Sequence, residues 1–238
     1  MDASDTSGGP AVGSAPALER RHADAAASRD RLIEATILCI ADYGPAGASV
    51  ERITGLAGVS RGLVRHHFGS KRALLRHAFD RLADEMRAAF GGEDPAEEPD
   101  PVAALRSAIA NELEQTVASP QRARAWFGFW QAALGDTDIR EANERLYTEE
   151  RERFSELFRA AAQQHGLKID HREAGIALVA LVDGAWNELL MEGARFGLDN
   201  AYALCDHYID MVLQLGESER KRAGGSESMR SREESLWP

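Results

Sequence analysis

The sequence predicts an all-α protein of about nine helices, in which a small N-terminal helix-turn-helix domain precedes a larger helical bundle. Apolar residues recur at spacings of three and four along most of the chain, as they do on one face of a helix. Ala, Leu, Arg and Glu dominate, and no segment alternates Val, Ile and Thr at strand length. Gly, Pro and acidic residues at 91–101 form a natural linker between the two expected domains.

Both ends of the chain are expected to be disordered tails. Residues 1–28 are rich in Ala, Gly, Ser, Pro and Asp, and residues 217–238 are dominated by Glu, Arg, Ser and Gly. The expected domains are therefore 29–90 and 101–216. The longest unbroken apolar run, 176–182, is shorter than a membrane span, and no basic start followed by an apolar run marks a secretory signal. We expect a cytoplasmic protein that does not bind a membrane.

The first helix is expected from about Arg29 to Tyr43, because the glycines and proline at 44–47 stop an apolar periodic segment. Ser49 is expected to cap a short second helix, Val50–Ala57, which ends in a tight turn at Gly58. The core-facing residues of the first helix are expected to be Leu32, Ile33, Thr36, Ile37 and Ile40.

Serine caps also predict the next two helices. Ser60 is expected to cap a third helix that ends near Phe68, and Ser70 a fourth that runs to about Phe90. The inward stripe of the fourth helix is expected to be Leu75, Phe79, Leu82 and Met86.

Five helices are expected beyond the linker, separated by prolines, glycines and polar breaks. Cys39 and Cys205 fall in apolar periodic stretches and are expected to be buried thiols in a reducing compartment. The expected helices are 102–118, 121–134, 137–165, 172–193 and 200–215.

The charge distribution points to a local polyanion-binding surface. A net charge of −11 would argue against a nucleic-acid partner if it were uniform. Between Ser49 and His77, however, six basic residues face a single acid, Glu51, and a local basic patch is what phosphate binding needs. The six are Arg52, Arg61, Arg65, Lys71, Arg72 and Arg76.

The segment from Ser49 to Arg72 (SVERITGLAGVSRGLVRHHFGSKR) has the pattern of a helix-turn-helix. A short helix and a glycine turn precede a second short helix that is crowded with Arg and His and thin enough to enter a major groove. The small core of this motif is expected to contain Ile53, Leu56, Ala57, Val59 and Val64.

This segment resembles the TetR family of regulators, which read A-G-V-S and then x-G-x-x-Y-x-H/Y-F-x-x-K. The chain has Ala57-Gly58-Val59-Ser60, Gly62, His67-Phe68 and Lys71 in register. The resemblance implies a TetR-like fold and a double-stranded DNA operator as partner. It implies phosphate contacts for Lys71, Ser49 and His67.

The recognition helix supplies the expected base contacts. Arg61, Gly62, Arg65 and His66, with Ser60 at the start, are the candidates, because an Arg reads guanine as a bidentate fork. Many family members have Tyr where this chain has Arg65, so a phosphate or a base role stays open for that residue. The alternative is a merely solvated basic face. No metal site is expected at His66-His67, since adjacent helical residues point in different directions, and no cofactor is expected.

The C-terminal half resembles the choline-responsive BetI branch of the family. The resemblance rests on ARAWFGFWQAALGD (123–136), RLYTEERERF (145–154) and ALVDGAW (180–186). It implies a small-molecule effector, which in that branch is choline or a related quaternary ammonium compound. It also implies a homodimer formed by the last two long helices, for which the fitting residues are Leu178, Leu181, Val182, Leu189, Leu190, Tyr208, Met211, Val212 and Leu215.

The residues themselves give independent support for a cation site. Trp126 and Trp130 share a helical face, Trp186 lies on another helix, and aromatic faces attract quaternary ammonium by roughly 1–2 kcal/mol each when desolvated. Asp183 can neutralise such a cation, and Tyr147 can join the cage. The open alternatives are a plain aromatic core or a pocket for an apolar effector.

No enzyme is expected, because the chain has no GxGxxG, P-loop, HExxH, GxSxG or Cys–His constellation. The paired acids Asp84-Glu85 and Glu149-Glu150 are expected on polar helix faces. A helical regulator that binds a protein instead of DNA is the remaining alternative.

Overall fold

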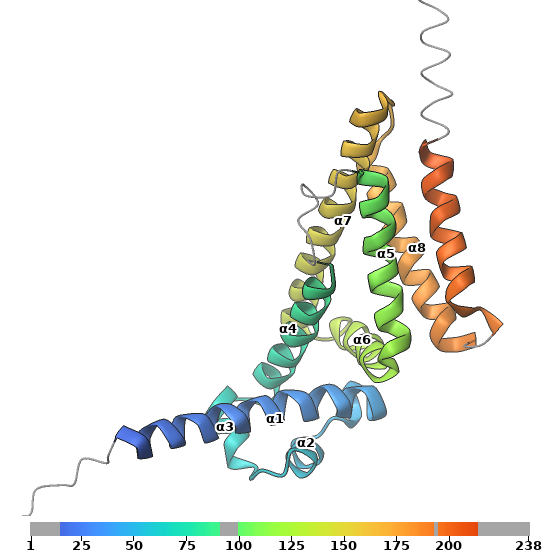
Figure 1. Cartoon of the computed structure of the whole chain (residues 1–238). Coiled ribbons are helices and arrows are strands. Elements are labelled where there is room, and N and C mark those ends of the chain that lie inside the picture. The colour runs from blue at the N-terminus through green and yellow to red at the C-terminus, as the bar shows by residue number, and fades with distance from the viewer. Residues whose placement is uncertain (1–14, 91–99, 193–194, 214–238) are drawn as a thin grey trace, which may run out of the picture.

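The computed structural model describes residues 15–90, 100–192 and 195–213, and throughout these ranges the chain forms helices and no strand (Figure 1). The predicted all-α class is confirmed. The helices are α1 (Ala15–Gly47), α2 (Val50–Ala57), α3 (Gly62–Phe68), α4 (Lys71–Phe90), α5 (Pro101–Ala118), α6 (Pro120–Ala133), α7 (Thr137–His165), α8 (His171–Glu192) and a last helix, 197–213.

The first helix is longer than predicted. It begins at Ala15, so residues 15–28 are helical and the prediction of a disordered tail is wrong for them. Ala, Leu, Glu and Arg are abundant there, and their helix propensity outweighs the serines. At its other end the chain breaks at Gly44, which has φ of 68°. The predicted tails at 1–14 and 214–238 and the linker at 91–99 lie outside the described residues.

The helix-turn-helix is built largely as predicted. The Ser49 hydroxyl accepts a hydrogen bond from the Arg52 amide at 3.2 Å, and Gly58 ends α2 with φ of 64°. The Ser70 hydroxyl accepts from the Ala73 amide at 3.1 Å. The prediction that the Ser60 side chain caps α3 is wrong, because Arg61 occupies the cap position and makes no side-chain cap bond.

Burial within this domain differs from prediction at two leucines. Ile53, Ala57 and Val64 are buried, but Leu56 is 55% exposed. On α4 the fully buried leucine is Leu74, which continues to Ala78 and Leu82 at helical spacing, while Leu75 and Met86 are half-buried. All five predicted core residues of α1 are buried.

Helix α6 packs the second half of the chain against the first half. Figure 1 shows α6 crossing between α1 and the upright helices α5, α7 and α8. A Cβ on Gly128 of α6 would lie 2.3 Å from the side chain of Ile40, so the glycine allows the two helices to touch. Phe79 of α4 packs edge-on against Trp126 and Phe129, with ring centroids 5.5 and 5.6 Å apart.

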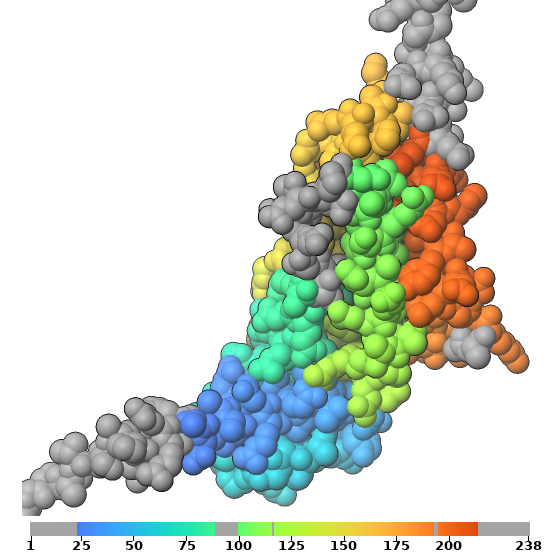
Figure 2. Space-filling model, viewed as in Figure 1, coloured from blue at the N-terminus to red at the C-terminus, as the bar shows by residue number. Residues whose placement is uncertain are grey.

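The last helix forms an outer wall beside α5 (Figure 2). Arg106 of α5 pairs with Asp206 at 3.2 Å and with Asp210 at 2.8 Å, and the Tyr208 hydroxyl donates to the Ala174 carbonyl of α8 at 3.1 Å. Cys39 and Cys205 are buried free thiols, as predicted.

Helix α8 is long and apolar enough by composition to cross a membrane, with mean hydropathy of 1.4 over its most apolar window. In the fold, however, Leu178 and Val182 are 0% and 1% exposed, packed inside the protomer. They therefore cannot form the dimer seam predicted for them. The exposed large apolar residues of α8 are Ile176 and Met191, at 49% and 71%.

Candidate DNA-binding face and effector pocket

The outer face of α3 carries three of the predicted DNA contacts. Arg65 and His66 are exposed on this seven-residue helix, and Ser60, Arg61 and Gly62 are exposed at its start. Arg61 pairs with Glu51 of α2 at 3.1 Å, with both side chains more than half exposed. An exposed pair of this kind is worth little, so the guanidinium is available to exchange Glu51 for a nucleic-acid acceptor.

The basic patch is smaller than the sequence suggests, because three of its six members are engaged elsewhere. Arg72 reaches Asp136 and Asp138 at the start of α7, at 3.1 and 3.0 Å. Arg76 pairs with Asp80 at 2.8 Å and donates to the Asp138 carbonyl. These two join α4 to α7.

The third engaged member of the basic patch is Arg52, which stacks on the Tyr43 ring at 4.4 Å and donates a hydrogen bond to the Gly47 carbonyl. Arg65 and Lys71 make no ion pair within the described part of the chain. The cations left for phosphate or base contacts are therefore Arg61, Arg65 and Lys71.

The other predicted phosphate contacts, Ser49 and His67, have surroundings that differ from those of Lys71. Ser49 uses its hydroxyl as the α2 cap. Burial lowers the pKa of His67, with the neighbouring His66 charge adding to it, and its ring packs edge-on at 6.2 Å from that of Phe68. The Nε2 atom is enclosed and has no hydrogen-bond partner among the described residues. His67 would have to turn outward to reach a phosphate through this nitrogen.

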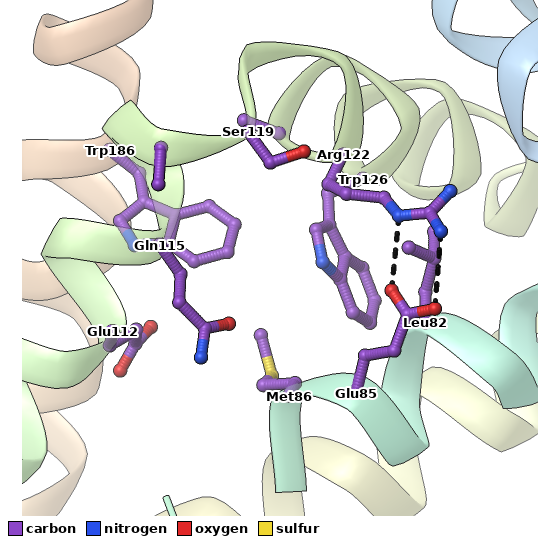
Figure 3. A pocket seen from close by; sticks show the side chains of 11 residues that line it. Leu82, Glu85, Met86, Glu112, Gln115, Ser119, Arg122, Trp126 and Trp186 are labelled. Carbon is purple, nitrogen blue, oxygen red and sulfur yellow. Dashed lines mark hydrogen bonds and ion pairs between the residues drawn. The ribbon is translucent and has the colours of Figure 1, made fainter. Parts of the chain in front are cut away.

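A cavity of about 300 Å³ lies between α4, α5, α6 and α8. The indole rings of Trp126 and Trp186 stand on two sides of it, with Met86 and Gln115 between them (Figure 3). Glu112 of α5 lies at the side nearer Trp186, and Arg122 and Glu85 line the opposite side.

The structure brings two of the five predicted effector residues to this cavity. Trp130 lies behind Trp186, with ring centroids 6.3 Å apart, and does not line the space. Tyr147 donates a hydrogen bond to Asp183 at 2.9 Å, and the Arg151 guanidinium lies 5.3 Å from the Tyr147 ring centre. Tyr147 and Asp183 therefore form a layer outside the lining, and the Tyr147 ring already carries a cation.

Two buried acids that sequence reasoning missed lie near this pair, Glu112 in the cavity lining itself and Glu150 outside it. Glu112 and Glu150 are only 4% and 8% exposed, so the prediction that Glu149-Glu150 lies on a polar face is wrong for Glu150. The helical spacing in the sequence does indicate that both acids are buried. Glu112 falls on the apolar stripe of Leu105, Ile109 and Leu113, and Glu150 on the stripe of Leu146, Phe154 and Leu157.

These acids hold protons more tightly than exposed carboxyls do. Burial raises the pKa of Glu112 well above its usual value, and the charges of Glu150 and Asp183 raise it further. Burial, with the charge of Asp183, raises the pKa of Glu150 to about 8. Burial raises the pKa of Asp183 to about 6, although the Tyr147 hydrogen bond opposes the shift. Cationic Arg153 and Arg151 favour the ionised forms.

The opposite wall of the cavity is an ion-pair cluster shared by three helices. Arg122 of α6 donates two hydrogen bonds of 2.8 Å to the Glu34 carboxylate of α1. The same guanidinium reaches Glu85 of α4, with Nε 3.1 Å from Oε2 (Figure 3). The sequence expectation of a merely polar face at Asp84-Glu85 is therefore wrong for Glu85, which faces the pocket.

Comparison with known proteins assigns both halves of the chain. Residues 32–78 match the model of bacterial regulatory proteins of the tetR family, and residues 101–214 match the C-terminal model of the BetI-type transcriptional repressor. The HTH-type transcriptional regulator BetI of Paraburkholderia xenovorans is 30% identical over 194 residues, which cover 79% of this chain and 95% of that protein. Its counterpart in Burkholderia thailandensis is 29% identical over 189 residues, covering 78% and 93%.

Solved structures agree with this assignment. A transcriptional regulator from Pseudomonas aeruginosa PAO1 superposes with a TM-score of 0.69 at 30% identity, covering 81% of this chain and 92% of that one. A regulator from Saccharomonospora viridis, solved in complex with choline, shares the fold with a TM-score of 0.68 at 21% identity, covering 76% and 95%. The chain is thus a member of the TetR family of DNA-binding transcriptional regulators, with a BetI-type C-terminal domain, and not an enzyme.

Proposed function

We propose that this protein is a cytoplasmic repressor that binds a palindromic operator as a homodimer and responds to a quaternary ammonium compound such as choline. The observation that carries the effector assignment is the single cavity in which the faces of Trp126 and Trp186 meet the buried carboxyl of Glu112. Desolvated aromatic faces recognise a cation without hydrogen-bond donors, and a cation bound in the cavity would favour the ionised form of the Glu112 carboxyl.

The charge around the cavity favours a cation. Arg122 lines it, but its charge is more than matched by Glu34 and Glu85, so these three groups carry a net charge of −1 when ionised. Glu112 adds a further acid at the opposite side. A volume of about 300 Å³ suits a small effector. The choline complex of the S. viridis regulator, which has the same fold, supports choline as the first compound to test.

Calorimetric titration with choline tests this assignment, with 3,3-dimethyl-1-butanol as the neutral compound of the same shape. We expect heat and a raised melting temperature with choline and weaker binding of the alcohol. Equal or tighter binding of the alcohol would instead assign the pocket to an apolar effector. If neither compound binds, the two indoles are part of the hydrophobic core and not of an effector site.

Trp186→Leu separates recognition from packing, because leucine keeps apolar contact but has no π face. Loss of roughly 1–2 kcal/mol of cation–π attraction weakens choline binding by roughly 5- to 30-fold. Trp130→Leu is the matched control, since Trp130 does not line the cavity, and we expect a smaller effect on choline binding there. Equal losses in the two variants would contradict the role of the Trp186 face.

On the DNA side, we propose that α3 enters the major groove. Arg61, Arg65 and His66 then face the base edges, Ser60 and Gly62 lie at the entry of the helix, and Lys71 holds a phosphate. Two copies of α3 must reach successive grooves about one DNA turn apart, roughly 34–36 Å, which is why a dimer is needed.

The proposed dimer seam is the outer stripe of α8 and the last helix. Ile176, Ala180 and Gly184 follow one another at intervals of four, and Met191 continues the stripe; all four are exposed. The space around Gly184 is open, with no atom within 4 Å of a built Cβ, so another helix can approach closely. Leu204 and Met211 form the exposed apolar side of the last helix, at 41% and 42%.

A further inference from the structure

We infer that Arg122 transmits occupancy of the pocket to the DNA-binding domain by losing its carboxylate partner on α4 while it keeps the one on α1. This inference rests on the proposed cationic effector and adds how that effector is sensed. Arg122 links the cavity wall to two helices of the N-terminal domain, since its side chain lines the cavity and bonds to Glu34 of α1 and Glu85 of α4.

The geometry makes Arg122 a shared group. Its two bonds to Glu34, both 2.8 Å, form the bidentate fork that an Arg and a carboxylate prefer. Its contacts to Glu85 are longer, 3.1 and 3.2 Å, and Glu85 itself lines the cavity while Glu34 does not. The weaker of the two partners is therefore the one that an effector can reach.

A cation in the cavity changes this balance in two ways. It attracts the Glu85 carboxylate, and it repels the Arg122 guanidinium, whose side chain is only 27% exposed and thus poorly screened by solvent. Both effects weaken the pair that joins α6 to α4. Helix α4 begins at Lys71, the proposed phosphate contact, so a change at Glu85 is carried along a single helix to the DNA-binding face.

At the other end of the cluster, Glu34 holds α6 to α1. Helix α6 is in van der Waals contact with α1 at Gly128 and Ile40, and Arg122 is bonded to the same helix at Glu34. When the cation loosens Arg122 from Glu85, α6 remains tied to α1 while α4 is released. The two helices that support the helix-turn-helix thus change their relation to each other.

The test uses Glu34→Gln, which breaks the charged fork without altering any residue that lines the cavity. The quantity measured is the coupling factor, the ratio of operator dissociation constants with and without saturating choline, from fluorescence anisotropy of labelled operator DNA. Allosteric factors are commonly about 5 to 150. We expect Glu34→Gln to bind choline more weakly than the wild type, because one of the two charges that offset Arg122 is lost, and, at saturating choline, to reduce the factor to less than about two.

Arg81→Gln is the matched control. Arg81 of α4 also pairs with an acid of α1, Asp30, at 2.9 Å, but it does not line the cavity. We expect this variant to keep the wild-type coupling factor. Arg122→Lys is the second test variant, because an ammonium keeps the charge but cannot form the fork. It should lower the factor without abolishing it, and thermal melting establishes that each variant is folded.

The outcomes separate the two proposals. If wild-type protein binds choline and responds to it, and folded Glu34→Gln or Arg122→Lys keeps the full factor, the role of Arg122 is overturned while the effector assignment stands. If wild-type protein neither binds choline nor responds to it, the effector assignment fails, and the inference that rests on it fails too. A loss of coupling in Arg81→Gln equal to that in Glu34→Gln also overturns a specific role for Arg122.

Discussion

Lys71 and Arg72 are neighbours in the sequence, yet the structure gives them different surroundings. Arg72 turns to Asp136 and Asp138 of α7, whereas Lys71, at the start of α4, makes no ion pair in the described ranges. Free amides at a helix start add to the attraction of a phosphate for Lys71. Charge along the sequence therefore located the basic segment, but only the fold shows which of its cations are held in ion pairs.

We predict that Lys71→Ala weakens binding to all DNA sequences about equally. Because one phosphate contact contributes about 0.9 to the slope of log affinity against log salt, the variant should flatten that slope by about one unit. Arg72→Ala is the control, and its slope should stay at the wild-type value although the α4–α7 ion pairs are lost. Titrations of operator and unrelated DNA at several salt concentrations decide the point. An unchanged slope for Lys71→Ala would contradict this placement of the DNA-binding face.

The buried acids show why residue-level prediction of the pocket was incomplete. Trp126 and Trp186 were identifiable because aromatic rings at helical spacing are conspicuous. Glu112 and Glu150 each fall on an otherwise apolar stripe, which is a weaker signal than an aromatic cluster. Tyr147 and Asp183, both predicted to surround the cation, bond to each other instead and lie outside the cavity lining. Which layer a residue occupies depends on how helices cross, and helical periodicity does not contain that information.

Among the elements, periodicity and caps predicted most helix positions well. Helices α2 and α7 have the predicted ends, and Ser49 and Ser70 cap as expected. The errors arose where a face had to be chosen. Leu178 and Val182 look like any other apolar residues of α8, but the contacts with the rest of the protomer occupy their side of the helix.

The exposed side of α8 gives a prediction for assembly. Ile176→Glu places a charge on the proposed seam, where a partner helix would bury it, so the variant should be monomeric yet folded. Leu178→Glu, only two residues away, buries the charge inside the protomer and should prevent folding. Light scattering and circular dichroism distinguish these outcomes. A dimeric Ile176→Glu protein would place the seam elsewhere.

For the whole molecule, the buried acids predict that stability falls as pH rises. The folded pKa of Glu150 is about 8, above its unfolded value of about 4.5. The folded state therefore binds more protons between these values, and stability decreases with pH at up to about 1.4 kcal/mol per unit for one proton. Asp183, raised to about 6, adds to the loss at the lower end of this window. Glu150→Gln removes one titrating group.

We accordingly expect Glu150→Gln to flatten the decline in unfolding free energy between pH 5.5 and pH 7.5, by about 2.5 kcal/mol at most. Urea denaturation at a series of pH values measures it. Glu149→Gln is the control, because Glu149 is exposed and pairs with Arg87 at the surface. A wild-type stability that is flat or rises across this range would show that Glu150 is ionised in the folded protein.

The central claim is that one molecule joins operator binding to a cation-sensing pocket. The most direct test is the affinity of the wild-type protein for the DNA upstream of its own gene, titrated with choline and, separately, with 3,3-dimethyl-1-butanol. We predict tight, salt-dependent binding to this DNA over unrelated sequence, and an operator affinity that changes with choline and not with the neutral alcohol. No preference for the upstream DNA, or equal responses to the two compounds, would contradict the account.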